Sequence, residues 1–278
     1  MIRVGIGGWT FDAWRNGAFY PKGLPKTGEL AYASRQLNSI EINATYHRNQ
    51  SPASFRKWAA ETPDDFVFSV KASRFVTNRR VLAEAGPSID NFLASGLTEL
   101  GPKLGPILWQ FAPTKKFEAD DFGAFLALLP GEYKETPLRH AIEIRHKSFV
   151  TPEFVKLARG HGVAIVIAHS PEHPLIADVT GAFVYARLQS SQANVATGYP
   201  LGEIAVWAER AKLWEAGKTP GDLPALVHLD PGTSAPDPRL KARGPNATGK
   251  RDVFVYVISG AKERAPAAAM ALLAAANA

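Results

Sequence analysis

Two glutamates lie near the ends of strand-like apolar runs, so their carboxylates could reach a ligand bound there. Glu41 is followed by Asn43, and Glu143 is followed by Arg145, and an isoleucine stands on each side of both glutamates. Because side chains alternate between the two faces of a strand, Glu41 shares a face with Asn43, and Glu143 shares one with Arg145. We expect both carboxylates to act in acid/base catalysis, with His146 as a further catalytic candidate.

Basic residues end or follow other strand-like runs. They are Lys71, Arg74, Arg145 and Arg187. Only the two glutamates oppose these four cations, so the group carries net positive charge. Arginine binds carboxylate or phosphate groups through two parallel hydrogen bonds, and lysine adds a compact charge. The pattern therefore favours a small anionic ligand, in one version a phosphorylated one.

Aromatic and neutral polar side chains at the strand ends complete the predicted substrate-binding site. We expect contacts from Trp9, Asn43, Tyr46, Trp109, Gln110 and His169 in addition to the four cations. A purely structural interpretation stays open, in which the charged residues form an internal ion-pair network that satisfies each buried charge. Asn43, Trp109 and Gln110 could equally be ordinary core or rim residues.

The sequence predicts no cofactor. It has no cysteine, no Walker A loop, no HExxH pair and no GxSxG elbow. The glycine-rich stretch at residues 5–8 is followed by Trp9 and Thr10 rather than by the start of a helix, which argues against a dinucleotide loop. The clustered basic residues would repel a divalent cation, so we expect no metal site, although a divalent metal stays an open alternative.

Eight short apolar runs could position these side chains. We predict strands at residues 2–7, 39–43, 66–71, 106–111, 140–144, 163–168, 182–188 and 253–258. Helical patterns separate most of them, at residues 28–36, 52–61, 88–100, 119–129, 152–161, 201–215 and 266–276. This alternation predicts an α/β protein with a single (β/α)8 TIM-barrel-like domain, in which functional groups sit at the C-terminal ends of the strands.

One domain covers residues 1–278 in this interpretation, with an insertion at residues 189–252 between the seventh and eighth strands. Its segment 219–251 is rich in proline, glycine and basic residues. Such a segment is a lid, a nucleic-acid-binding arm or a passive insertion, and the sequence does not decide among them. The connection at residues 169–181 is too short and too rich in proline for a full helix.

Composition restricts the class of protein. The hydrophobic fraction of 46% over 278 residues supports a sizeable core. We find neither a signal peptide nor about 18 consecutive apolar residues, so we expect a cytoplasmic protein without a membrane partner. The net charge of +6 favours anionic partners but does not separate metabolites from nucleic acids. The oligomeric state is not readable from the sequence.

Several segments together resemble the YecE-like family, known as domain of unknown function 72. They are GIGGW at 5–9, IEINATY at 40–46, FSVKA at 68–72, LGPILWQF at 104–111 and IEIRH at 142–146, with further similarity at 183–188 and 253–256. The resemblance implies a TIM-barrel-like fold and a pocket around Glu41, Asn43, Lys71, Gln110, Glu143, Arg145 and Arg187. It implies no established reaction.

The leading functional interpretation is an enzyme of lyase, isomerase or hydrolase type that acts on a small anionic molecule. In the alternative, the basic insertion and the strand-end cations bind nucleic acid, and Trp9, Tyr46 or Trp109 stack on an exposed base. A third interpretation is a non-catalytic binding protein that uses the same pocket. The sequence alone does not separate the three.

Overall fold

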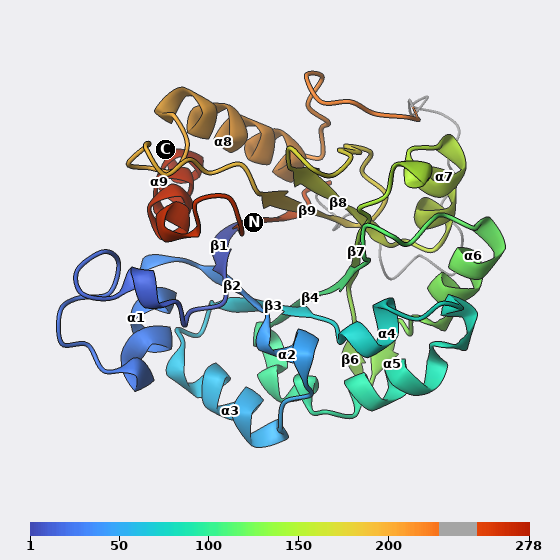
Figure 1. The fold of residues 1–278 in the computed structure, drawn as a ribbon, viewed down its shortest axis with the longest axis horizontal. Coiled ribbons are helices and arrows are strands. Elements are labelled where there is room, and N and C mark those ends of the chain that lie inside the picture. The colour runs from blue at the N-terminus through green and yellow to red at the C-terminus, as the bar shows by residue number, and fades with distance from the viewer. Residues whose placement is uncertain (228–248) are drawn as a thin grey trace.

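Eight parallel strands close into a barrel in the computed structural model, which describes residues 1–227 and 249–278 (Figure 1). The strands follow the order β1-β10-β9-β8-β7-β4-β3-β2 around the barrel. Their bounds are β1 Ile2–Gly7, β2 Ser39–Ile42, β3 Val67–Lys71, β4 Leu104–Gln110, β7 His140–Glu143, β8 Ala164–His169, β9 Phe183–Leu188 and β10 Asp252–Val257. A small separate ribbon pairs β5 (Glu132–Tyr133) with β6 (Thr136–Pro137). The predicted TIM-barrel-like fold is confirmed.

Helices surround the barrel (Figure 1). They are α1 Glu29–Gln36, α2 Ala44–His47, α3 Pro52–Glu61, α4 Arg74–Thr77, α5 Gly86–Leu93, α6 Ala119–Leu128, α7 Pro152–Gly160, α8 Leu201–Glu215 and α9 Ala265–Asn277. The Ser51 side chain caps α3 and that of Thr151 caps α7, each before a proline at the start of the helix. The short helices α2 and α4, which the sequence did not predict, follow β2 and β3 directly.

The helix expected at residues 88–100 is interrupted. Helix α5 ends at Leu93, and a 3-10 stretch follows at Leu97–Lys103. Between them Gly96 adopts φ of +101°, and a Cβ atom there would lie 2.7 Å from Pro52. Glycine permits both the left-handed backbone and this close approach, so the chain turns where a continuous helix was predicted.

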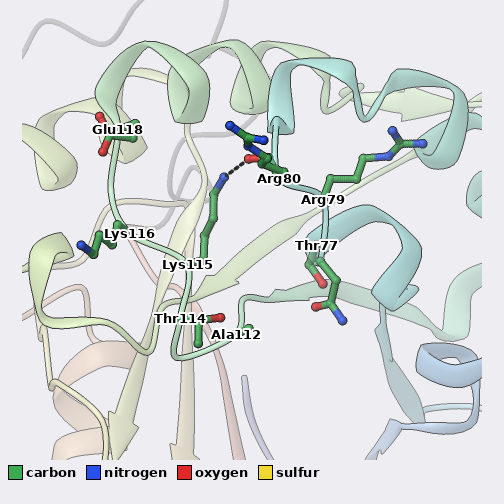
Figure 2. A pocket seen from close by; sticks show the side chains of 9 residues that line it. Thr77, Arg79, Arg80, Ala112, Thr114, Lys115, Lys116 and Glu118 are labelled. Carbon is green, nitrogen blue, oxygen red and sulfur yellow. Dashed lines mark hydrogen bonds between the residues drawn. The ribbon is translucent and has the colours of Figure 1, made fainter.

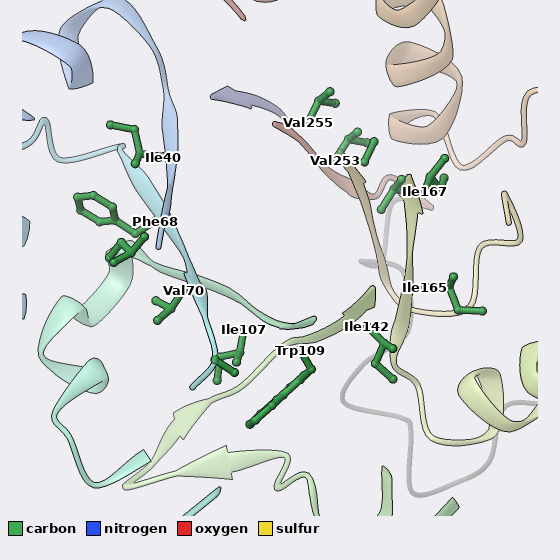
Figure 3. Packing of buried hydrophobic residues seen from close by; sticks show 14 of the residues in the cluster. Ile40, Phe68, Val70, Ile107, Trp109, Ile142, Ile165, Ile167, Val253 and Val255 are labelled. Carbon is green, nitrogen blue, oxygen red and sulfur yellow. The ribbon is translucent and has the colours of Figure 1, made fainter. Parts of the chain in front are cut away.

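Alternation along the strands sorts their side chains into two layers. One set faces the helices and includes Ile40, Val70, Ile107, Trp109 and Ile142, as Figure 3 shows. The other set fills the barrel interior with Val67, Leu108, Ala141, Ala164, Val166, Phe183, Tyr185, Phe254 and Tyr256. This packed interior is typical of TIM barrels, and it leaves the polar residues at the strand ends to form the mouth.

The insertion between β9 and β10 is described only in part. Both Asp178 carboxylate oxygens accept hydrogen bonds, from the backbone N–H groups of Leu226 at 2.7 Å and Val227 at 2.9 Å. Asp178 therefore ties the described part of the insertion to the connection after β8, which contains no helix, as the sequence predicted. Most of the segment predicted to be a lid, an arm or a passive insertion lies at residues 228–248, outside the described residues.

Candidate functional site

The buried guanidinium of Arg187 joins two carboxylates across the barrel interior. Its Nη2 and Nε atoms donate to Glu41 Oε1 and Oε2 at 2.9 and 3.1 Å, and its Nη1 donates to Glu143 Oε2. Arg187 is 1% exposed and both glutamates are fully buried. Burial alone would lower the pKa of Arg187, but the two carboxylates reverse the direction and raise it. This arginine is therefore charged, and each of its three guanidinium nitrogens donates to a glutamate.

Glu143 receives two further donors. Gln110 Nε2 donates to its Oε2 and Arg145 Nε donates to its Oε1, both at 2.9 Å. Burial would raise the pKa of Glu143, but the charges of Arg187 and Arg145 and the hydrogen bonds outweigh it and lower the pKa to about 2. Glu143 is therefore an ionised, fully bonded carboxylate.

A tyrosine hydroxyl below the ion pairs donates a further hydrogen bond to Glu41, and a serine hydroxyl contacts that tyrosine. The Tyr185 phenol donates to Glu41 Oε2 at 2.7 Å, and Ser69 Oγ lies 2.7 Å from the same phenol oxygen. Burial and the nearby Glu41 charge raise the pKa of Tyr185 well above its ordinary value, which keeps the phenol protonated as a donor. A comparable pair, Ser39 and Tyr256, lies 2.7 Å apart in the same interior.

Lys71 stands apart from this network. Its ammonium lies 4.1 Å from the centre of the Tyr46 ring, and it has no hydrogen-bonded or ion-paired partner among the described residues. Burial, followed by the positive charge of Arg187, lowers the pKa of Lys71 to about 8, and the glutamates offset only part of this. Both the protonated and the neutral form of Lys71 are therefore populated at pH values close to neutral.

Arg145 is the other cation with unused donors. Its side chain is 23% exposed, and it spends only Nε on Glu143, so its terminal nitrogens have no protein partner in the described part of the chain. With Lys71 protonated, three cations face two carboxylates, which leaves one unit of positive charge. The arrangement can bind an anion and can transfer a proton at Lys71.

The structure brings seven predicted site residues together around the barrel mouth: Glu41, Tyr46, Lys71, Gln110, Glu143, Arg145 and Arg187. It also brings Asn43 to the mouth, because a Cβ atom on the inward-facing Gly7 would lie 2.8 Å from its Nδ2 atom. The absence of a side chain at Gly7 makes room for this amide.

The two tryptophans predicted as walls of the site differ in their placement. The alternation of β4 turns Trp109 to the helix side, where it is fully buried against Phe92 and Phe125 (Figure 3). Trp9, just after β1, is partly buried and packs edge-on against Trp58 of α3, with ring centres 5.2 Å apart. Trp109 is therefore not a wall of the mouth, and the role predicted for Trp9 stays a prediction.

The predicted histidines serve other local contacts. His146 Nδ1 accepts the backbone N–H of Ser148 at 3.1 Å and so caps a short helical turn. His169, whose pKa is lowered by burial, lies over Trp207 of α8 with its Nε2 3.8 Å from Glu203. Nothing among the described contacts links either ring to the ion pairs.

Arg74, which was predicted to bind the ligand, is exposed, and its guanidinium lies 5.5 Å from the centre of the Phe75 ring. It thus projects from α4 rather than into the network, because α4 turns the chain away directly after β3. The described contacts do not connect it to the glutamates.

Two residues near the mouth were missed by the sequence interpretation. Tyr185 lay within a predicted strand and was not named as a site residue, although its alternation with Arg187 along β9 places both on one face. His173 lies in the connection after β8, and burial, followed by the charge of Arg145, lowers its pKa. Its Nδ1 atom is buried without a partner in the described structure. No sequence pattern pointed to this histidine.

Within residues 1–227 and 249–278, no group of three or more His, Asp or Glu side chains is arranged to hold a metal ion. The same residues contain no helix that is long and apolar enough to cross a membrane.

Residues 3–242 match the sequence profile of a family described as "Protein of unknown function DUF72". The UPF0759 protein YunF of Bacillus subtilis (strain 168) is 26% identical over 159 residues, which cover 55% of this chain and 54% of YunF. The chain thus spans about half the length of this curated relative.

Two solved structures share the fold. The DUF72 family protein TM1631 from Thermotoga maritima has a TM-score of 0.70 and 20% identity, with all of both chains covered. The DUF72 family protein EF0366 from Enterococcus faecalis has a TM-score of 0.68 and 19% identity, covering 100% of this chain and 96% of that one. At this identity the similarity concerns the fold.

Proposed function

The chain belongs to the DUF72 family, and on the geometry of its barrel mouth we propose that it is an enzyme acting on a small anionic substrate. The site lies at the C-terminal ends of the strands, where TIM barrels place their catalytic groups. The supporting observation is that the three cations differ in how many of their donors the protein itself uses. Arg187 is saturated by two glutamates, whereas Arg145 and Lys71 keep donors that the described protein does not use.

Arg145 and Lys71 bind the anion in this proposal. The Glu143 carboxylate holds Arg145 through Nε, which leaves its terminal nitrogens for a carboxylate or phosphate group of the substrate. Lys71 adds a compact charge beside the Tyr46 ring. The substrate is a carboxylated or phosphorylated metabolite, and the two forms differ in charge but use the same donors.

Proton transfer is reassigned from the glutamates to Lys71. Acid/base catalysis requires a group whose pKa lies near the working pH. Glu143, with a pKa of about 2, stays ionised and fully bonded, so it positions Arg145 and Arg187. Lys71, with a pKa of about 8, exists in both forms around that pH, so its protonated form attracts the anion and its neutral form, with Arg145 holding the anion, can accept a proton. Abstraction of a proton next to a carbonyl or carboxylate, a step common to many lyases and isomerases, fits this amine.

The nucleic-acid alternative has less support at the mouth. It needs exposed aromatic rings on which bases stack. Trp109 is buried under the helices, Trp9 is packed on Trp58, and Tyr46 is covered on one face by Lys71. A small ligand therefore accounts better for the mouth.

A thermal-shift screen tests the proposal. The wild type is screened against carboxylated metabolites, phosphorylated metabolites and a single-stranded oligonucleotide, together with Arg145→Gln, Lys71→Met and the surface control Lys156→Gln. We expect a small anion to raise the melting temperature of the wild type and the control but not of the two mouth variants. Stabilisation that survives in both mouth variants, or that only the oligonucleotide provides, would contradict the proposal. A stabilising anion is then assayed for turnover, and binding without turnover would leave a binding protein.

A further inference from the structure

A pocket opens on the rim of the barrel, beside the mouth. It lies between the segment that ends α4 and continues to residue 80 and the loop after β4, and its volume is about 530 Å³ (Figure 2). Its lining is Thr77, Asn78, Arg79, Arg80, Ala112, Thr114, Lys115, Lys116 and Glu118. None of these residues takes part in the ion-pair network of the mouth. We call this the rim pocket.

Positive charge dominates the lining of the rim pocket. Arg79, Arg80, Lys115 and Lys116 oppose Glu118 in the lining and Asp121 just outside it, which leaves two units of positive charge. Lys115 is anchored by the Arg80 carbonyl at 2.9 Å and by Asp121, outside the lining, at 3.0 Å. Four cations gathered from two loops repel one another, and a bound anion would relieve that repulsion.

Two buried polar atoms at the rim pocket lack a protein partner. Thr77 is 1% exposed and its hydroxyl has no hydrogen bond in the described structure, and the same holds for the buried Nε atom of Arg79. Arg79 spends Nη2 on Ser88 Oγ at 2.9 Å, which fixes its position at the edge of the pocket. A buried donor without a partner destabilises the folded protein, so such groups usually serve a ligand or an ordered water.

We propose that the rim pocket is a second anion site that binds a phosphate monoester or a short polyphosphate. The Thr77 hydroxyl donates to a phosphate oxygen, and Arg80 and Lys116 neutralise the charge from the opposite walls. A phosphate group suits the pocket because it accepts hydrogen bonds on several oxygens, whereas a carboxylate has two. The volume exceeds that of one phosphate group and leaves room for the remainder of the ligand or for a second phosphate.

Calorimetric titration with inorganic phosphate and pyrophosphate tests this site. Arg80 and Lys116 are exposed, so the double variant Arg80→Gln/Lys116→Gln should fold normally. Lys22→Gln/Lys156→Gln lowers the net charge equally on exposed positions and is the matched control. We expect the rim double variant to weaken pyrophosphate binding about tenfold or more, and Thr77→Val to weaken it about fivefold, while the control binds as the wild type does.

The remaining variant separates this inference from the proposed function. Arg145→Gln changes only the mouth, so we expect it to leave pyrophosphate binding at the rim pocket unchanged. The inference is overturned if pyrophosphate does not bind, or if the control weakens binding as much as the rim variants do. It is also overturned if Arg145→Gln alone abolishes binding, or if a single-stranded oligonucleotide binds there and pyrophosphate does not. In each case the thermal-shift screen still tests the proposed function of the mouth separately.

Discussion

Arg187 and Glu41 face each other across the interior of the barrel and form a two-pronged ion pair, with N–O distances of 2.9 and 3.1 Å. They belong to β9 and β2, which are separated by β10 and β1 in the barrel wall. The guanidinium also holds Glu143 of β7, so three strands that are not neighbours are joined by one side chain. This link fixes the frame on which Arg145 and Lys71 are placed.

Replacement of Arg187 tests that structural role. Arg187→Met leaves the buried Glu41 without its cation and leaves Glu143 with Arg145 alone, and we expect it to lower the free energy of unfolding by about 3–5 kcal/mol. Urea denaturation followed by circular dichroism measures the change. The control is Arg56→Met, which breaks an exposed pair with Glu99 and should cost at most about 1 kcal/mol. Equal losses of unfolding free energy in the two variants would mean that the buried ion pairs stabilise the protein no more than the exposed pair does.

Glu143 should determine part of the acid sensitivity. Its folded pKa of about 2 lies below its ordinary value of 4.5, so its stabilising contribution is present above pH 4.5 and is lost as the pH falls through 2. We expect wild-type stability to decline over this window more steeply than that of Glu143→Gln, which has no proton to gain. Unfolding free energies of both proteins between pH 5 and the lowest pH at which they fold provide the comparison. Parallel curves would refute the assignment.

Lys71 should have the opposite dependence on pH. Its folded pKa of about 8 lies below its ordinary value of 10.5, so the charged amine opposes folding below pH 8, and this penalty disappears as the pH rises to 10.5. We expect Lys71→Met to be more stable than the wild type at pH 7 by about 1–2 kcal/mol, after the lost contact with Tyr46 is counted. Urea denaturation at pH 7 and above pH 10 measures the difference. A variant that is less stable at pH 7 would contradict this.

The same titration should appear in ligand binding. Lys71 is protonated below pH 8, so we expect the affinity of the mouth for an anion to fall as the pH rises through about 8. In Lys71→Arg the charge stays on, and the fall in affinity should disappear. Calorimetric titrations of the stabilising anion at pH 7 and pH 9 measure the change. A fall of equal size in the wild type and in Lys71→Arg would place the titrating group elsewhere.

Lys103 supports the wall of the barrel away from the mouth. Its buried ammonium donates to the carbonyl groups of Ala59 at 2.6 Å and Thr62 at 2.8 Å, where α3 ends. A cation here satisfies free carbonyls and faces the negative end of the helix dipole. We expect Lys103→Met to destabilise the protein by about 2 kcal/mol. The matched control is the exposed Lys57→Met, and similar values for the two variants would be evidence against this capping role.

The number, order and bounds of the strands could be predicted from the sequence because side chains alternate between the two faces of a strand, so the residue pattern repeats every second residue. The predicted strand limits agree with the structure to within two residues. The same alternation correctly paired Glu143 with Arg145. The short helices α2 and α4 escaped prediction because four residues are too few to show a helical period.

The site was only partly readable because a strand end does not reveal which side of the sheet a side chain takes. Trp109 stands next to Gln110, yet the two side chains leave β4 on opposite faces, and only Gln110 reaches Glu143. His173 lies in a connection without a periodic pattern, so its approach to Arg145 depends on tertiary packing. We propose positioning roles for Arg187 and Glu143, rather than the ligand-binding and catalytic roles predicted from the sequence, because their hydrogen bonds to each other are visible only in the three-dimensional contacts.

The most direct test of the account is the position of an anion in crystals. We would grow or soak crystals at pH 7 with selenate, whose selenium atom scatters anomalously, and calculate the anomalous difference map. We expect a peak within hydrogen-bonding distance of the Arg145 terminal nitrogens and Lys71 Nζ, which disappears in Arg145→Gln crystals. Selenate bound elsewhere while the mouth of the wild-type barrel stays empty would contradict the central claim that this mouth binds anions.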